Sequence, residues 1–251
     1  MYIHSLIFLC CSAGLIFHNG NIIAASSEKT SALVRQLIAA DDIHVPPNAD
    51  QPGQPVTVTV SLSAAGIQHD RRQPDVVILH GTLELQWKNS RLTWEPQQHN
   101  NITLVQLPVE HVWLPDITLY NRASASASSS CDDARSQVYP ANRRMLSVHS
   151  EGSVTWIAPV SFPLSCNNTV GGGEVHCAIK LASWTYHGLL IDLKAGSDKI
   201  QAIDYVDSSP LGSNYRITNS TVVRNVVFYA CCPELFPSID MTFTAKRAAA
   251  S

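Results

Sequence analysis

Alternation of hydrophobic and polar residues constrains the fold of this chain more than any other feature. From Val56 to Leu62, every second residue is Val or Leu and the residues between them are threonines and a serine. This period of two is expected for a strand with one buried face. Similar runs recur at Val76–Leu79, Leu83–Trp87, Ile102–Leu107, Ser153–Ile157, Ala178–Trp184, Leu189–Leu193, Thr221–Tyr229 and Ile239–Thr244. Because turn-rich segments separate these runs, the sequence predicts an all-β antiparallel sandwich or barrel.

A short amphipathic helix is expected before the first strand. Between residues 27 and 40, four apolar residues recur at helical spacing, namely Leu33, Val34, Leu37 and Ile38. This spacing gathers them on one face, which predicts a short amphipathic helix at the start of the mature chain.

The first residues are typical of a secretory signal. An apolar run fills much of residues 6–17, and the small residues Ala24-Ala25-Ser26 offer a cleavage site. We therefore expect a signal peptide at 1–25, one domain at 26–247 and a short tail at 248–251. Asn-x-Ser/Thr sequons at Asn101, Asn167 and Asn219 are then expected to be glycosylated in a secreted, extracellular protein.

Composition and motifs exclude several function classes. The net charge is -3 and charged residues make up 15% of the chain, so a nucleic-acid partner is not expected. After the signal, no apolar stretch is long enough to span a membrane. The sequence has no metal-spaced His/Cys cluster, glycine-rich phosphate loop or nucleophile elbow. We therefore expect a protein that binds no metal or cofactor and has no enzymatic activity. An esterase ranks last among the functions considered, because no catalytic triad is evident.

Two consecutive cysteines, Cys231-Cys232, stand out among the five that remain after the signal. Consecutive Cα atoms lie about 3.8 Å apart, below the usual disulfide range of roughly 4.4–6.8 Å, so a bond between them would close a strained ring at a loop tip. Two free thiols, or two cysteines paired elsewhere, are the alternatives. Cys131 lies in the low-complexity segment 122–133, which is expected to be exposed; surface reactivity or an intermolecular bridge is expected for it.

Four separated segments resemble, in the correct order, the motifs of Cys-loop ligand-binding domains. The segment from Trp113 to Asn121 resembles the one with the first binding aromatic, and Cys166 to Cys177 resembles the Cys-loop. Residues 182–186 resemble the binding-tryptophan segment. Residues 229–234 resemble the vicinal-cysteine cap of nicotinic α-subunits and acetylcholine-binding proteins. The resemblance extends over essentially the whole mature chain.

This resemblance implies a fold and a covalent structure. The fold is an immunoglobulin-like antiparallel β-sandwich with a short N-terminal α-helix. The implied intrachain disulfides are Cys166–Cys177 and Cys231–Cys232, which leaves Cys131 over. The implied assembly is a homopentamer with ligand sites between neighbouring subunits.

The resemblance also implies a ligand class and a principal binding face. Acetylcholine and related cationic small molecules have a quaternary nitrogen without N–H groups, so aromatic rings hold it through cation–π contacts. The residues implied on this face are Tyr120, Trp184, Tyr229, Cys231, Cys232 and Phe236. Lys180 resembles a lysine near the capping tyrosine, with a solvated surface charge as the alternative.

The complementary face is implied by two further segments. Residues 82–87 resemble the first, and their alternation places Thr82, Glu84 and Gln86 on one side. Residues 154–157 resemble the second, with Thr155 and Ile157 facing the ligand and Trp156 packing into the core. Thr82 stands where family members usually carry an aromatic residue.

Two other departures concern the cap and the Cys-loop. Phe236 replaces a usual tyrosine, and the ten residues between Cys166 and Cys177 are polar and glycine-rich, whereas receptors carry a longer apolar loop. Receptors also continue into a membrane helix where this sequence stops after Ala248–Ser251. We therefore expect a secreted soluble protein that sequesters transmitter. The alternatives are the extracellular domain of a nicotinic-type channel subunit and a structural pentamer with weak ligand binding.

Overall fold

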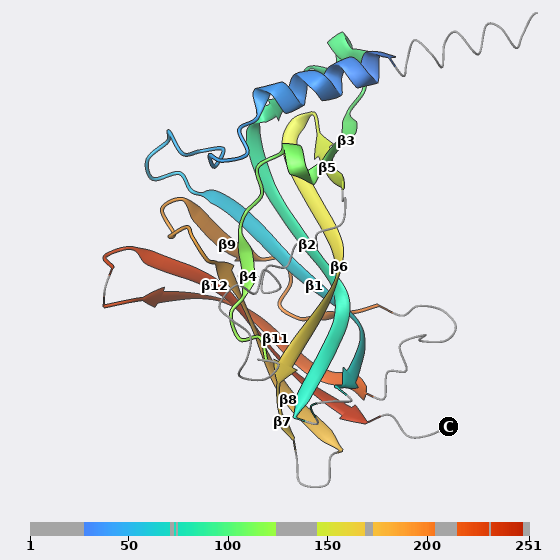
Figure 1. Ribbon diagram of the computed structural model, residues 1–251, viewed down its shortest axis with the longest axis vertical. Helices are drawn as coiled ribbons and strands as arrows, with labels where there is room; N and C mark the ends of the chain where they lie inside the picture. The colour runs from blue at the N-terminus through green and yellow to red at the C-terminus, as the bar shows by residue number, and fades with distance from the viewer. Residues whose placement is uncertain are drawn as a thin grey trace, which may run out of the picture.

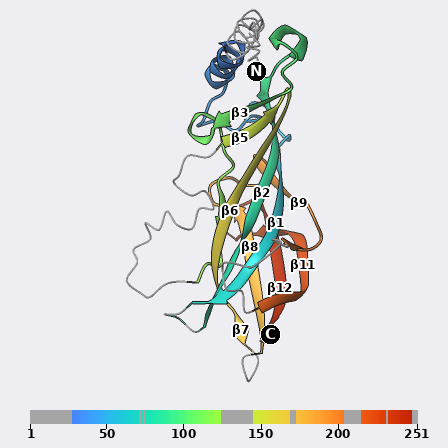
Figure 2. The ribbon, with the colours of Figure 1, turned by 90° about the vertical axis from the view of Figure 1, so that its right-hand side faces the viewer.

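The computed structural model describes residues 28–70, 73, 75–123, 145–168, 173–203, 215–230 and 232–247. Two β-sheets face each other, with a helix over residues 28–40 at one end and the final strand running to the opposite end (Figures 1 and 2). The expected signal peptide, the tail at 248–251, Cys131 and Cys231 lie outside the described residues. Within the described residues, no helix is both long and apolar enough to cross a membrane.

Within the described residues, the larger sheet, sheet A, has seven strands. Its order is β10-β1-β2-β6-β5-β3, and β9 also pairs with β1. The pairings of β1 with β9 and β10 are parallel, and the others are antiparallel. The strands are β1 (Val56–His69), β2 (Val76–Thr93), β3 (Leu104–Pro108), β5 (Met145–His149), β6 (Glu151–Ser165), β9 (Ile191–Ala195) and β10 (Gln201–Ala202).

The part of the chain that the structure describes gives the smaller sheet, sheet B, five strands in the order β11-β12-β8-β4, with β7 paired to β8. All of its pairings are antiparallel. The strands are β4 (Ile117–Leu119), β7 (Asn167–Asn168), β8 (Glu174–Ser183), β11 (Tyr215–Phe228) and β12 (Leu235–Arg247), and two short 3-10 helices are η1 (Pro96–His99) and η2 (Val109–His111).

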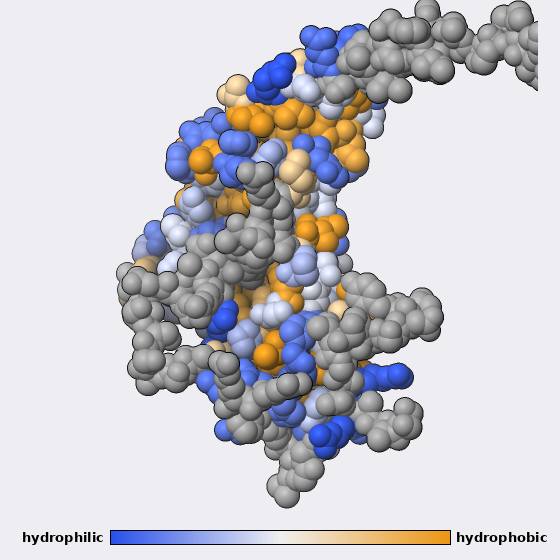
Figure 3. All heavy atoms as spheres, turned by 45° about the vertical axis from the view of Figure 1, so that its right-hand side comes forward, coloured by the Kyte–Doolittle hydropathy of each residue, from blue (hydrophilic) through white to orange (hydrophobic). Residues whose placement is uncertain are grey.

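The core lies between the inward faces of the two sheets. Alternate residues of β1, β2 and β6 are buried, so the period-two pattern correctly predicts which side chains point inward. Leu33 and Leu37 of the helix are also buried, and on the face seen in Figure 3 hydrophobic residues gather at the helix end of the molecule. The predicted all-β sandwich with a short N-terminal helix is confirmed.

The predicted strand boundaries differ from the structure in an instructive place. The runs Val76–Leu79 and Leu83–Trp87 were expected as separate strands, but they form one continuous strand, β2. Gly81 lies between them because the backbone of β1 approaches closely: a Cβ built on Gly81 would lie 2.2 Å from the carbonyl oxygen of Ser63. A register shift between Ala64 and Gly66 lies beside this contact. The glycine therefore serves strand packing and not a turn.

Other boundaries differ by up to eight residues, as at the end of β6 (Ser165 against the predicted Ile157), and the short strands β4, β5, β7 and β10 were not predicted. Two shifts concern the site, because Trp184 and Tyr229 were expected inside strands. Strand β8 ends at Ser183 and β11 ends at Phe228. Both aromatic residues therefore begin loops, where the alternation of a strand does not decide which way a side chain points.

A buried carboxylate fastens the end of the helix to the sandwich. Asp41, whose side chain is fully buried, accepts hydrogen bonds from Arg91 Nε at 2.7 Å, Asn89 Nδ2 at 3.0 Å and the backbone N–H of Trp113 at 2.8 Å. Arg91 also donates to the carbonyl oxygens of residues 42, 45 and 46. These charge-assisted bonds fix the start of the segment that leads to Tyr120.

Candidate ligand-binding site

Four aromatic side chains form two ring contacts at the ends of sheet B strands. The centroids of Tyr120, directly after β4, and Trp184, directly after β8, lie 5.4 Å apart. Tyr229 and Phe236, from the hairpin that joins β11 and β12, have centroids 5.3 Å apart. Trp184 is 70% exposed, which is unusual because tryptophan is highly buried on average. We call these four residues the aromatic cluster.

Asp116 organises the loop that carries Trp184. One oxygen of its carboxylate accepts a hydrogen bond from the hydroxyl of Ser183, and the other accepts one from the backbone N–H of Thr185 at 2.6 Å. The backbone carbonyl of Asp116 also accepts the N–H of Trp184 at 3.4 Å. The loop is therefore held on both sides of Trp184 by a single aspartate.

The buried side chain of Trp113 packs against Tyr186, a residue that helps to hold the loop of Trp184. The ring of Trp113 contacts those of Trp87 and Tyr186, with centroids 6.3 and 6.5 Å away. Tyr186 donates its N–H to Ser183 Oγ at 2.9 Å. A continuous set of contacts thus runs from Asp41, through Trp113, to the loop of Trp184.

Tyr120 is fixed at both its backbone and its hydroxyl. Its O–H donates to the carbonyl oxygen of Ser183 at 2.8 Å, and its N–H donates to the carbonyl of Lys180 at 2.9 Å. Burial raises the pKa of the Tyr120 phenol, with smaller contributions from Tyr229 and Asp116. The phenol stays neutral and remains a hydrogen-bond donor.

Lys180 lies beside Tyr120, and its expected place near the capping tyrosine stays a prediction. Its Nζ is 6.0 Å from the centroid of the Tyr120 ring, at the limit of a cation–π contact. Asn121 holds this part of β8 with bonds of 2.8 Å to the Ala178 carbonyl and from the Lys180 N–H. A solvated surface role for Lys180 remains compatible with its half-buried position.

The predicted complementary residues lie together on the outward face of sheet A. Glu84 of β2 pairs directly with Ile157 of β6, and the pairs Thr82–Pro159 and Gln86–Thr155 flank it. Ile157 is 55% exposed, whereas Trp156 is 1% exposed and packs into the core. The amide of Gln86 donates to Glu84 Oε1 at 2.6 Å. We call Thr82, Glu84, Thr155 and Ile157 the strand face.

The aromatic cluster and the strand face belong to different parts of one subunit. The cluster is built on β4, β8 and the β11–β12 hairpin, all of sheet B. The strand face points outward from sheet A, and in a sandwich such a face points away from the other sheet. The two sets therefore lie on different sheets and different surfaces of the chain.

The capping hairpin is described in part. The N–H of Cys232 donates to the Tyr229 carbonyl at 3.1 Å, which forms a turn. Because Cys231 lies outside the described residues, the Cys231–Cys232 disulfide stays a prediction. The Cys166–Cys177 disulfide is present, with sulfur atoms 2.04 Å apart.

Three asparagines were expected to carry glycans. No residue was expected to bind a metal ion. Asn101, Asn167 and Asn219 are all exposed, and their glycosylation stays a prediction. Within the described ranges, no group of His, Cys, Asp and Glu side chains is arranged to hold a metal ion.

Sequence reasoning missed the residues that hold the aromatic cluster in place. Asp116 and Ser183 were inside recognised segments, but neither was given a role. Their signal was only their position next to the binding aromatics, since the hydrogen bonds join residues 67 positions apart. No feature of the sequence marked Asp41 as important, because its hydrogen-bond partners lie far along the chain, in β2 and in the segment after η2.

Comparisons with known proteins now identify the family. Residues 30–249 match the family model described as the neurotransmitter-gated ion-channel ligand binding domain. Over 197 residues the chain is 29% identical to acetylcholine receptor subunit alpha-type acr-16 of Caenorhabditis briggsae, covering 77% of this chain and 36% of that protein. It is 28% identical to human neuronal acetylcholine receptor subunit alpha-2 over 197 residues, covering 76% of this chain and 34% of the human protein.

A longer match is to rat neuronal acetylcholine receptor subunit alpha-10, with 26% identity over 240 residues, or 94% of this chain and 50% of the rat protein. The chain thus spans about a third to a half of the relatives it matches. The family consists of ligand-binding domains and is not an enzyme class, as the sequence predicted. The chain belongs to the neurotransmitter-gated ion-channel ligand-binding domain family, with nicotinic-type receptor subunits among its homologues.

Proposed function

We propose that this chain is a secreted subunit of a homopentamer that binds acetylcholine and related nicotinic ligands between subunits, and so sequesters transmitter. The observation that carries the proposal is the exposed Trp184 ring beside Tyr120, at a centroid distance of 5.4 Å. A quaternary ammonium group cannot be held by hydrogen bonds at its nitrogen. Desolvated contacts with aromatic faces supply about 2 kcal/mol or more each.

The site is completed by a neighbouring subunit. The aromatic cluster of one subunit faces the strand face of the next, where Glu84 and the exposed Ile157 offer a negative charge and an apolar surface. The hairpin with Cys231 and Cys232 closes over the bound ligand. This division of the site makes ligand binding depend on ring assembly.

Titration of the secreted, purified protein with acetylcholine and with nicotine tests the proposal, with intrinsic tryptophan fluorescence as the signal. Saturable quenching by both ligands is expected because Trp184 contacts the cation. Light scattering should give a mass about five times that of the glycosylated subunit. No quenching at millimolar ligand, or a monomer that still binds, would refute the interface site.

Two other functions each have one observation in their favour. The relatives are receptor subunits of which this chain spans about a third to a half, which favours the extracellular domain of a channel subunit. Fractionation of cells that express the natural gene decides this: protein in the medium supports secretion, and protein in membranes supports a channel.

The absence of an aromatic ring at Thr82 favours a structural pentamer. In that case light scattering would show the pentamer, and the ligand titration would show no fluorescence quenching.

A further inference from the structure

Two of the predicted glycosylation sites lie at opposite ends of one row across sheet B. In this row, Asn219 of β11 pairs with Thr244 of β12, Thr244 pairs with His176 of β8, and His176 pairs with Asn167 of β7. Adjacent strands lie about 4.8 Å apart, so the two asparagine backbones are about 14 Å apart along the row. The two asparagines are 52 positions apart in the sequence (219 − 167), so the sequence alone gives no sign that they lie near each other.

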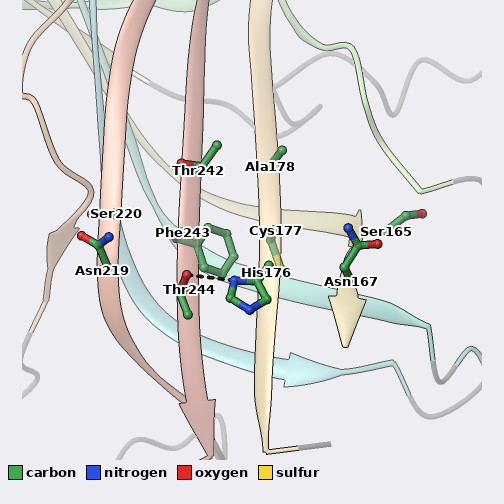
Figure 4. A pocket seen from close by; sticks show the side chains of 10 residues that line it. All are labelled: Ser165, Asn167, His176, Cys177, Ala178, Asn219, Ser220, Thr242, Phe243 and Thr244. Carbon is green, nitrogen blue, oxygen red and sulfur yellow. Dashed lines mark hydrogen bonds between the residues drawn. The ribbon is translucent and has the colours of Figure 1, made fainter. Parts of the chain in front are cut away.

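A shallow pocket of about 350 Å³ occupies the surface between the two asparagines (Figure 4). Asn219 and Asn167 stand at its two sides, and Thr242, Thr244, His176 and Ala178 line the surface between them. It lies on the part of sheet B near β7, at the end of the molecule away from the helix (Figure 1). This volume is within the range of small-molecule sites.

The lining combines hydroxyl groups with a small apolar floor. His176 Nδ1 and Thr244 Oγ1 are 3.1 Å apart, and Thr242 Oγ1 lies 2.7 Å from Thr221 Oγ1, which is outside the lining. Ala178, which pairs with Thr242, presents only a methyl group between these polar side chains. Hydroxyl groups around an apolar floor suit a sugar ring, which has hydroxyl groups at its edge and C–H groups on its faces.

Asn219 is the better anchored of the two asparagines. It lies in β11, which pairs with β12 from Tyr215 to Phe228, and a register shift between Ile217 and Asn219 leaves both Thr218 and Asn219 exposed. Asn167 belongs to the two-residue strand β7. A group attached to Asn219 therefore starts from a fixed backbone at the edge of the pocket.

We propose that the pocket seats the first N-acetylglucosamine residues of a glycan attached to Asn219, so that this glycan lies across β12 and β8 toward Asn167. The inference rests on the secretory route in the proposed function, but not on the ligand. It makes this part of sheet B a sugar-covered outer surface and excludes it from contacts between subunits.

The test is digestion of the folded, secreted protein with a peptide N-glycosidase, with occupancy at each site followed by glycopeptide mass spectrometry. The Asn219 glycan is expected to be removed about tenfold more slowly than the Asn101 glycan, because it must first leave the pocket. Asn101 lies in the turn between η1 and β3 and is not part of a strand. After denaturation and reduction, the two glycans should be removed at equal rates.

Variants that fill the pocket separate seating from other causes of slow digestion. Ala178→Trp leaves both sequons intact and should abolish the difference between Asn219 and Asn101. Thr242→Arg serves the same purpose if the tryptophan variant fails to fold. Gln106→Trp, at an exposed position of β3 in the other sheet, is the matched control and should preserve the difference.

Each outcome decides the inference. Equal digestion rates in the unmodified protein, or slow digestion that persists in both filled variants, would overturn it. An Asn219 without glycan in a protein that carries one at Asn101 would also overturn it, while leaving the secretory route intact. If no site carried a glycan and the protein stayed inside the cell, the secretory part of the proposed function would fail as well.

Discussion

The aromatic cluster and the strand face differ in how their backbones are held. Three members of the cluster, Tyr120, Trp184 and Tyr229, lie just beyond β4, β8 and β11, and hydrogen bonds accepted by Asp116 and by the Ser183 carbonyl hold Tyr120 and the Trp184 loop. The strand face sits in the middle of β2 and β6, where ladder pairing continues on both sides. A loop-borne site therefore depends on a few polar side chains, whereas side chains on the strand face can be exchanged without moving the backbone.

Removing the central ring should have the largest effect on binding. Trp184→Ala is expected to weaken acetylcholine binding at least about 30-fold, since a desolvated cation–π contact is worth about 2 kcal/mol or more. Isothermal titration measures this without the tryptophan signal. Trp184→Phe is the control, because it keeps a ring and should lose less. Equal affinity in the alanine variant would mean that the cluster is not the site.

Removing the fastening aspartate should have the next largest effect. Asp116→Ala leaves Ser183 and the Thr185 N–H without their acceptor, which should lower the free energy of unfolding by about 1–3 kcal/mol. Binding should weaken as well, because Trp184 loses its fixed position. Chemical denaturation and titration measure the two effects.

Asp192→Ala is the matched control for the Asp116 variant. Asp192 pairs with Arg224 at 2.6 Å on a partly exposed surface, where a salt bridge is worth about 0–1 kcal/mol. The Asp192→Ala variant should therefore change neither the ligand affinity nor the free energy of unfolding by much. Similar losses in both variants would show that Asp116 has no special role at the loop.

Adding a ring to the strand face should have a smaller, opposite effect. Thr82→Trp is expected to tighten quaternary ammonium binding by up to about tenfold, or 1–2 kcal/mol, without a loss of stability. Gln86→Trp, on the same face and strand, is the control and should have less effect. If Thr82→Trp left affinity unchanged while Trp184→Ala destroyed it, the assigned register of this strand against the ligand would be wrong.

The smallest expected effect is on the pH dependence of stability, and it concerns the cluster alone. The pKa of Tyr120 is raised above 10.0, chiefly by burial. As pH rises above 10, the unfolded chain releases this proton before the folded one, so the folded state loses stability. Tyr120→Phe should therefore flatten the alkaline decline in unfolding free energy. An unchanged decline in that variant would assign it to other groups.

The sequence by itself determined the sandwich and the direction of most strand residues. Period-two alternation decides which side chains are buried, and burial agrees with the positions that the resemblance implied for Trp156 in the core and Ile157 outside it. It also supplied the motifs that led to the family. These properties are local, because a strand's alternation and a motif's spacing are fixed by residues close together in the chain.

Only the tertiary structure decided which residues hold the aromatic cluster in place and which distant residues lie on the same surface. The role of Gly81 depends on the backbone of Ser63 in another strand, and the role of Asp116 depends on a loop 67 residues later. The row from Asn219 to Asn167 likewise depends on the order of four strands. Hydrogen bonds and strand pairing join residues across long sequence separations, so no local pattern records them.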